Sequence, residues 1–271
     1  MIKLQDYPDQ NLIKLDQYCD NTNEFNFFPN GHLDNFDDYQ TLVDSQSADW
    51  YYRNNSVTYT TNNQNYRCDN FNNVDWSNSI IMLGCSFVYG IGVDDQNTLP
   101  SQLSKLTNSP VVNLGATGCS QQFCLYNLTI LRQANIKPKA VVIAWPHSKR
   151  TFVLKNSRQL HGGHFNNWFL HPRFPYEKVF AEFETHRINY IFNRTTANLL
   201  YSDVPVIHTS FYKDDVEDQL TLNNDIALLP VIDKARDLKH PGMETFKNSA
   251  AMIYRKLLAP PKRIELLFPG S

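Results

Sequence analysis

Short apolar runs, separated by segments with helical spacing, dominate the chain from about Val74 onward. The first three runs are continuous, as expected of strands that are buried on both faces of a parallel sheet. Two weaker runs follow, and a proline in the first of them indicates a start at or near a sheet edge. The five expected strands are residues 80–83, 111–114, 140–145, 204–207 and 226–232.

The segments between these runs carry apolar residues three and four positions apart, which is typical of helices that pack one face on a sheet. Strands that alternate with helices in this way predict a mostly parallel sheet with right-handed crossovers. We therefore expect an α/β protein with a mostly parallel five-stranded sheet. The expected helices cover residues 99–106, 121–134, 177–200 and 244–258.

The first 73 residues lack this alternation. Aromatic side chains are scattered there among Asp, Asn and Gln, so we expect an irregular, partly helical extension packed on the main domain. An alternating pattern over residues 50–66, with two Asn pairs as turn candidates, predicts a small hairpin. The predicted division is an N-terminal extension (1–73), a main domain (74–258) with a long polar and aromatic excursion at 147–176, and a C-terminal tail (259–271).

Charge and cysteine content argue against several classes of protein. The 271 residues carry a formal net charge of -2 at pH 7, so no general attraction to nucleic acid or to an anionic membrane is expected. The five cysteines are an odd set without CxxC spacing, which favours free thiols over a disulfide framework or a zinc site. With neither an apolar signal region nor a run of about 18 apolar residues, we expect a soluble protein without a signal peptide or membrane span, cytoplasmic or virion-associated.

The strongest candidate for chemistry is Ser86, in a glycine-rich turn after the first apolar run. Open α/β sheets bind ligands at the carboxyl edge of their strands, where this turn is expected to lie. A serine hydroxyl is a weak nucleophile that needs a base, and an imidazole supplies one near neutral pH. Asp237 and His240 lie three residues apart before a Pro-Gly turn, a spacing that lets a carboxylate orient the nearby ring. Ser86, His240 and Asp237 are therefore candidates for a nucleophile, its base and an orienting acid.

Three motifs resemble signature blocks of the SGNH/GDSL hydrolases. The first block is resembled by Gly84-Cys-Ser-Phe-Val-Tyr-Gly90, the second by Val111-Val-Asn-Leu-Gly-Ala-Thr-Gly118, and the fifth by Asp237-Leu-Lys-His240 with Pro-Gly after it. The resemblance covers about residues 74–258 and implies a three-layer α/β/α sandwich related to flavodoxin-like sheets. It also implies a nucleophile (Ser86), a base (His240), an acid (Asp237), and an oxyanion hole that uses the backbone N–H groups of Ser86 and Gly118.

Two positions depart from the family pattern. Cys85 stands where the family usually has aspartate, but that residue is not the nucleophile. The third block normally supplies an asparagine that donates to the oxyanion, whereas this chain reads Ala144-Trp-Pro-His147-Ser148. Either His147 or Ser148 donates instead, or the hole relies on the two backbone amides. Loss of one donor typically costs about 10²–10³ in kcat, so slow or differently tuned catalysis is a credible outcome.

Other motifs favour other sites only weakly. His161-Gly-Gly-His164, with His171 nearby, invites a metal interpretation, but no carboxylate stands at ligand spacing, so a surface or substrate-covering loop is favoured. The glycines around Ser86 form neither GxGxxG nor a P-loop. We therefore expect no metal and no cofactor.

The expected activity is that of a serine ester hydrolase that cleaves short acyl esters, acetyl in particular, on a small molecule or glycan through an acyl-enzyme. The short acyl group follows from family habit and from the lack of an evident amphipathic lid. One alternative is a non-catalytic glycan-binding or viral structural module that keeps the fold. Others are a lipase or thioesterase, and an O-acyltransferase. The oligomeric state stays open.

Overall fold

The computed structural model describes residues 43–55, 57, 59–148, 150, 153–155, 158–160, 185–213 and 226–259. Its centre is a five-stranded sheet with the order β2-β1-β3-β6-β7, in which every neighbouring pair is parallel. This is the 2-1-3-4-5 order of flavodoxin-like doubly wound sheets. The expected mostly parallel sheet is confirmed. Its strands are β1 (Ile80–Gly84), β2 (Val111–Gly115), β3 (Ala140–Trp145), β6 (Val206–Ser210) and β7 (Ala227–Leu228).

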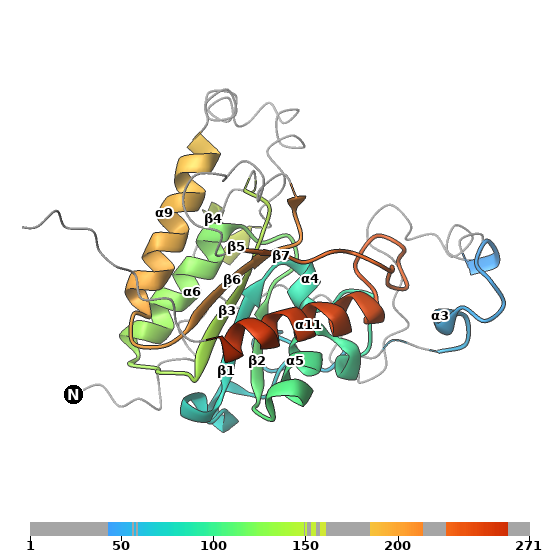
Figure 1. Cartoon of the computed structure of the whole chain (residues 1–271), viewed down its shortest axis with the longest axis horizontal. Helices are drawn as coiled ribbons and strands as arrows, with labels where there is room; N and C mark the ends of the chain where they lie inside the picture. Colours follow the sequence, from blue (N-terminus) through green and yellow to red (C-terminus); the bar gives the residue numbers. More distant parts are fainter. Residues whose placement is uncertain are drawn as a thin grey trace, which may run out of the picture.

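Helices cover both faces of this sheet and give three layers (Figure 1). One layer contains α6 (Gln121–Gln133) and α9 (Thr185–Leu200), which pack against each other. The other contains α5 (Leu99–Thr107) and α11 (Met243–Leu258), which also pack together. A single-turn helix, α4 (Ser86–Tyr89), follows the end of β1. The α/β/α sandwich expected from the sequence is therefore present.

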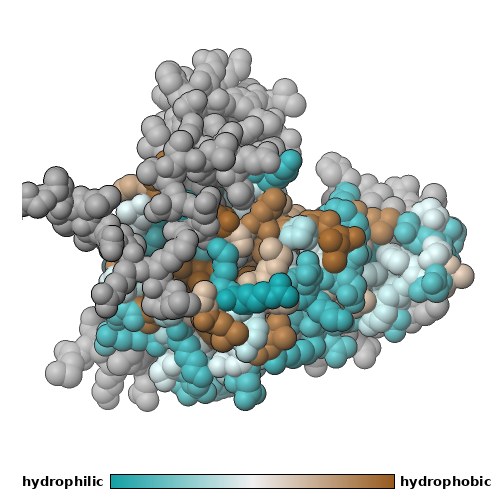
Figure 2. All heavy atoms as spheres, viewed as in Figure 1, coloured by the Kyte–Doolittle hydropathy of each residue, from teal (hydrophilic) through white to brown (hydrophobic). Residues whose placement is uncertain are grey.

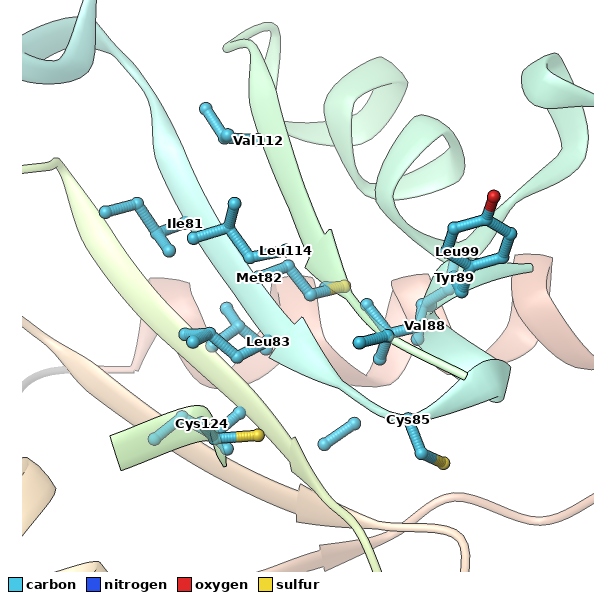
Figure 3. Packing of buried hydrophobic residues seen from close by; sticks show 14 of the residues in the cluster. Ile81, Met82, Leu83, Cys85, Val88, Tyr89, Leu99, Val112, Leu114 and Cys124 are labelled. Atoms are coloured by element: carbon cyan, nitrogen blue, oxygen red, sulfur yellow. The ribbon is translucent and has the colours of Figure 1, made fainter. Parts of the chain in front are cut away.

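The central strands are apolar because both of their faces are covered by helices. All residues of β1 and β3 are buried. Figure 3 shows three consecutive β1 side chains, Ile81 to Leu83, packed among side chains of β2 and α4. Burial of each such side chain contributes roughly 1.5–3 kcal/mol relative to exposure. This core therefore fixes where β1, β2 and β3 end, and with them the turns that carry polar residues.

The hairpin expected at residues 50–66 is not present in the described residues of that stretch. They form α3 (Tyr51–Asn54) and a tight turn in which Asn62 Oδ1 accepts hydrogen bonds from the N–H groups of Gln64 (2.9 Å) and Tyr66 (3.0 Å). Tyr59 and Tyr66 are buried in the main hydrophobic core. The alternating tyrosines thus reflect packing against the main domain, and the pairing of two strands was the wrong interpretation.

Three further elements differ from the expectations. β7 is shorter than predicted, and Pro230, which has no N–H to donate, follows two residues after it. β6 lies between β3 and β7, so its leading proline marks the start of a strand and not a sheet edge. In the excursion, β4 (Val153–Lys155) and β5 (Arg158–Leu160) form an antiparallel pair that the pattern did not predict.

Some predictions fall on residues that the structure does not describe. These are residues 1–42 of the N-terminal extension, residues 161–176 of the excursion with the histidines of the proposed metal motif (His161, His164 and His171), residues 177–184 of the long helix, and all of the C-terminal tail except its first residue. Within the described ranges, no helix is both long and apolar enough to cross a bilayer. Figure 2 shows apolar residues near the middle of one face, with polar residues along α11 below them.

Candidate active site

The residues predicted for the site all follow the carboxyl ends of sheet strands. Ser86 follows β1, Gly118 follows β2 and His147 follows β3, while Asp237 and His240 come after β7 and before α11. Because all five strands are parallel, these ends meet at one edge of the sheet, where open α/β folds bind their ligands.

Ser86 is held at this edge by close packing between α4 and the end of β2. A Cβ atom on Gly115 would lie 2.8 Å from the carbonyl carbon of Val88, so only glycine allows this approach. Asn113 donates from Nδ2 to the Val88 carbonyl (3.1 Å), and its Oδ1 accepts the Gly115 N–H (2.9 Å). Figure 3 shows Val88 and Cys85 beside the end of β1. The second sequence block therefore serves to seat the helix that begins with Ser86.

Asp237 and His240 lie on a closed loop, the 233–242 loop. A bridge between Lys234 and Pro241 closes it, and the Ala235 N–H donates to the His240 carbonyl at 2.9 Å. At its base, the Asp233 carboxylate accepts the backbone N–H groups of the first two residues after Met243, at 3.1 and 2.7 Å. Asp233 thus satisfies the free amides at the start of α11 and fixes the loop to that helix.

The structure brings the three predicted triad residues together. Ser86 Oγ lies 2.9 Å from His240 Nε2, and His240 Nδ1 is hydrogen-bonded to Asp237 Oδ2. The Asp237 side chain is fully buried, whereas the side chain of His240 is 14% exposed. Because an ionised carboxylate can only accept, it holds the ring with its proton on Nδ1. His240 Nε2 is then an acceptor for the Ser86 hydroxyl proton.

Asp237 is in an environment that favours its charged form. Burial is the largest single influence and by itself would raise its pKa, but the hydrogen bond and charge of His240 and two backbone N–H bonds outweigh it. The net effect is a lowered pKa. The two N–H groups, from Lys239 (3.0 Å) and His240 (2.9 Å), both donate to Asp237 Oδ1. Asp237 therefore stays ionised wherever a neutral His240 could act as a base.

The backbone amides of Ser86 and Gly118 lie on neighbouring turns. The pairing of β1 with β2 continues one residue past the strands, because Ala116 N–H donates to the Gly84 carbonyl at 2.9 Å. Gly118 then adopts a φ of 67°, in the region that favours glycine. Within the described residues, the N–H groups of Ser86 and Gly118 donate to no partner. Their role as oxyanion donors stays a prediction.

His147, the other candidate oxyanion donor, lies on the loop after β3. Its ring packs edge-on against Tyr212, with 5.0 Å between ring centroids. This contact places His147 beside the aromatic residues that line the edge of the site. Its role as a donor also stays a prediction.

An aromatic cluster next to His240 was not predicted as part of the site. The Phe87 ring lies 5.5 Å from the His240 ring in an edge-to-face arrangement, and it also packs on Phe211 (5.1 Å) and Tyr212 (5.7 Å). All three aromatic residues are half-buried. Phe211 and Tyr212 directly follow β6, so the rule that strand ends meet at the ligand edge could have identified them.

A second unpredicted contribution comes from Tyr59 and Arg67, in the segment before β1. The Tyr59 hydroxyl accepts the Gly92 N–H at 2.7 Å, and the Gly92 carbonyl accepts the Arg236 N–H at 3.1 Å. Arg67 donates to the carbonyls of Gly90 and Val93. The turn formed by residues 90–93 is therefore braced from one side by this segment and supports Arg236, the residue before Asp237, on the other.

No protein-family model matches the sequence, and no curated protein is similar to it. Solved structures are similar to the chain in fold. One is a carbohydrate esterase family 2 enzyme with a carbohydrate-binding domain from Corynascus thermopiles (11% identity, 66% of this chain and 65% of that chain, TM-score 0.39). Another is a member of the lipolytic G-D-S-L family from Veillonella parvula (16% identity, 65% of this chain and 96% of that chain, TM-score 0.40). A third is an acetyl xylan esterase from Butyrivibrio proteoclasticus (10% identity, 68% of this chain and 64% of that chain, TM-score 0.41).

These are GDSL proteins and carbohydrate esterases. Of the three, the Veillonella protein carries the G-D-S-L family name in its description. The chain spans less than two thirds of the Corynascus and Butyrivibrio enzymes. At TM-scores between 0.39 and 0.41, the likeness carries no weight for activity. The case for a function rests on the geometry of Ser86, His240 and Asp237.

The described residues offer no evident site for a metal ion. No group of three or more His, Cys, Asp and Glu side chains within these ranges is arranged to hold one. His240 is instead engaged on both ring nitrogens, by Asp237 and Ser86.

Proposed function

We propose that the protein is a serine ester hydrolase. The observation that carries this proposal is the 2.9 Å contact between Ser86 Oγ and His240 Nε2, with His240 Nδ1 bonded to a buried carboxylate. Hydrogen-bonding reach from nucleophile to base, and from base to an orienting acid, is the arrangement that activates a serine. It joins two stretches that are 154 residues apart in the chain.

The reaction proceeds in two stages. His240 Nε2 takes the Ser86 hydroxyl proton as Oγ attacks the ester carbonyl carbon, and the carbonyl oxygen becomes an oxyanion facing the amides of Ser86 and Gly118. His240 then gives the proton to the departing alcohol, which leaves an acyl ester on Ser86. Water attacks this ester, passes a proton to Nε2, and the acid departs as the proton returns to Ser86 Oγ. Asp237 stabilises the imidazolium in both stages and stays unprotonated.

The substrate is proposed to carry a short acyl group, acetyl in particular, on a small molecule or glycan. The short chain follows from the resemblance described above. The aromatic cluster of Phe87, Phe211 and Tyr212 lies on the His240 side, where the alcohol receives its proton. Half-buried aromatic rings there favour an alcohol with an apolar face, as a sugar ring has.

The test is labelling with a fluorophosphonate, combined with turnover of p-nitrophenyl acetate. The wild-type protein should hydrolyse the ester and gain one adduct, which peptide mass spectrometry should place on Ser86. Ser86→Ala should abolish both, whereas Ser77→Ala, at an exposed serine before β1, should change neither. A folded wild-type protein that gains no adduct and cleaves no ester in a panel would refute the proposal. Glycan binding that survives in Ser86→Ala would then favour the non-catalytic alternative.

Acyl transfer is separated from hydrolysis by the acceptor. Both reactions share the acyl-enzyme, so labelling of Ser86 does not distinguish them. With a sugar alcohol present, an esterase should release mainly free acid, whereas a transferase should form a new ester at the expense of acid. Chromatographic measurement of the two products decides between them.

A further inference from the structure

Arg150 lies at the same edge of the sheet, five residues after the end of β3. It is half-buried. Its Nη2 donates to the Tyr212 hydroxyl at 3.3 Å, its Nη1 donates to the Cys119 carbonyl at 3.4 Å, and its guanidinium carbon lies 5.8 Å from the centre of the Tyr212 ring. These contacts hold the guanidinium in place beside the site.

The two partners of Arg150 belong to the surroundings of the predicted oxyanion hole. Cys119 is the residue after Gly118, and its thiol donates to the carbonyl of Gly84 at 3.2 Å. The Tyr212 hydroxyl lies 3.6 Å from the sulfur of Cys85, the residue before Ser86. Arg150 is therefore connected to both turns that present the two backbone amides, one turn through each of its hydrogen bonds.

Arg150 has no carboxylate partner among the described residues. Its hydrogen-bond partners are the Cys119 carbonyl, the Tyr212 phenol and the side chain of Cys85, whereas Arg53, Arg67 and Arg132 in the same described ranges each pair with an aspartate. Taking a guanidinium partly out of water without a counter-charge costs free energy. Burial is the largest cause of a strongly raised pKa of Tyr212, so its hydroxyl is neutral and supplies no negative charge.

We propose that Arg150 is the side-chain donor of the oxyanion hole, in place of the asparagine that the third block lacks. The proposal rests on the ester hydrolase function proposed above. The negative charge that would pair with Arg150 is then the one that develops on the substrate carbonyl oxygen during attack by Ser86. A guanidinium has five N–H donors, so two can be held by Tyr212 and Cys119 while others face the oxyanion. A charge-assisted donor is also stronger than the neutral amide that it replaces.

The experiment compares Arg150→Met, Arg150→Lys and a control, Arg132→Met, whose arginine pairs with Asp203 on a different part of the molecule. For each, kcat and KM are measured on p-nitrophenyl acetate, a neutral ester, together with the rate of Ser86 labelling by a fluorophosphonate. Arg150→Met should lower kcat by about 10²–10³, with KM changed far less, because the lost interaction exists in the transition state. Labelling should slow in parallel, because the phosphonyl oxygen occupies the same hole.

Two further results are expected. Arg150→Lys keeps a positive charge and should retain more activity than Arg150→Met. Added methylguanidinium should restore part of the activity of Arg150→Met and leave the wild type unchanged, which a purely structural role would not produce. Arg132→Met should behave as wild type throughout. Circular dichroism checks that each variant is folded, and Arg150→Lys decides the matter if Arg150→Met does not fold.

The outcomes separate this inference from the function on which it rests. If wild-type Ser86 is not labelled, the hydrolase proposal fails and the role of Arg150 fails with it. If wild-type Ser86 is labelled and a folded Arg150 variant is labelled and turns over at the wild-type rate, the triad stands and the role of Arg150 is refuted. If the loss appears in KM for an anionic ester and not in kcat for the neutral one, Arg150 binds a substrate anion and the inference is also wrong.

Discussion

Tyr59→Phe should weaken the site from a distance, through the turn of residues 90–93. Tyr59 is 3% exposed, and its hydroxyl accepts the N–H of the buried Gly92. Phenylalanine keeps the ring, and with it the guanidinium of Arg67 4.2 Å above the ring centre. The substitution therefore removes the acceptor of the Gly92 N–H and keeps the packing of the ring.

The cost follows from what is left behind. A buried N–H without an acceptor typically costs about 1–3 kcal/mol. Gly92 cannot easily turn elsewhere, because even a Cβ atom on it would lie 2.8 Å from the Ala235 Cβ, and its carbonyl already accepts the Arg236 N–H. Any relaxation of the turn is thus passed to the residues next to Asp237. We expect a loss of about 1–3 kcal/mol in the free energy of unfolding and a several-fold lower kcat.

Tyr52→Phe is the matched control. The Tyr52 hydroxyl is also buried, but it has no hydrogen-bond partner among the described residues. Because a buried hydroxyl without a partner costs free energy, its removal should leave the free energy of unfolding unchanged or raise it, and should leave kcat unchanged. Urea denaturation and p-nitrophenyl acetate kinetics measure both effects. The reasoning is wrong if Tyr59→Phe is as stable and active as wild type, or if Tyr52→Phe loses as much.

Two further predictions concern the acid of the triad and a buried histidine. In Asp237→Asn, Oδ1 can still accept the N–H groups of Lys239 and His240, so folding should be retained. The new amide NH₂ faces His240 Nδ1 and forces the ring proton onto Nε2, so kcat should fall by about 10⁴. Activity within tenfold of wild type would contradict this. His208 accepts the Trp145 indole N–H (3.1 Å) and faces Asn198 Oδ1 (2.9 Å), and burial, followed by the charges of Arg194 and Lys256, lowers its pKa from 6.5 to about 3. In the unfolded chain His208 binds a proton below pH 6.5, whereas in the folded chain it does so only below about pH 3. The contribution of neutral His208 to the free energy of unfolding is therefore complete above pH 6.5, and between pH 6.5 and pH 3 it falls by about 1.4 kcal/mol for each unit by which the pH is lowered. Urea denaturation at several pH values should show a shallower acid loss in His208→Gln, which keeps an acceptor and a donor, and parallel profiles would refute the assignment.

The parts of the fold that could be predicted are those encoded by neighbouring residues. The strand at 140–145 has the predicted bounds, because a continuous apolar run that is stopped by Pro146 leaves little choice. The meeting of Ser86 with His240 and Asp237 could be predicted because each lies in a local motif at a strand end. At residues 50–66, the sequence could not distinguish a hairpin from an irregular segment with buried tyrosines, since an alternating pattern indicates which residues are buried and not what covers them.

The residues that were missed act through tertiary contacts that leave no local pattern. Tyr59 supports Gly92 from 33 positions away, and nothing in the sequence around it differs from that of other tyrosines. Phe211 and Tyr212 follow a strand whose end was placed three residues too early, so they were not assigned to the ligand edge.

The missing asparagine of the third block shows the same limit most clearly. A motif comparison identifies the residue at a given sequence position, so it indicated His147 and Ser148, the residues directly after the strand and its proline. Stabilisation of an oxyanion requires only that a hydrogen-bond donor lies close to the oxygen, whichever sequence position supplies it. A long guanidinium side chain can reach such a point from further along the loop, as Arg150 does in contacting Cys119 and Tyr212. The departure in sequence therefore need not be a loss of chemistry, because the position that supplies the donor can move while the place of the donor stays fixed.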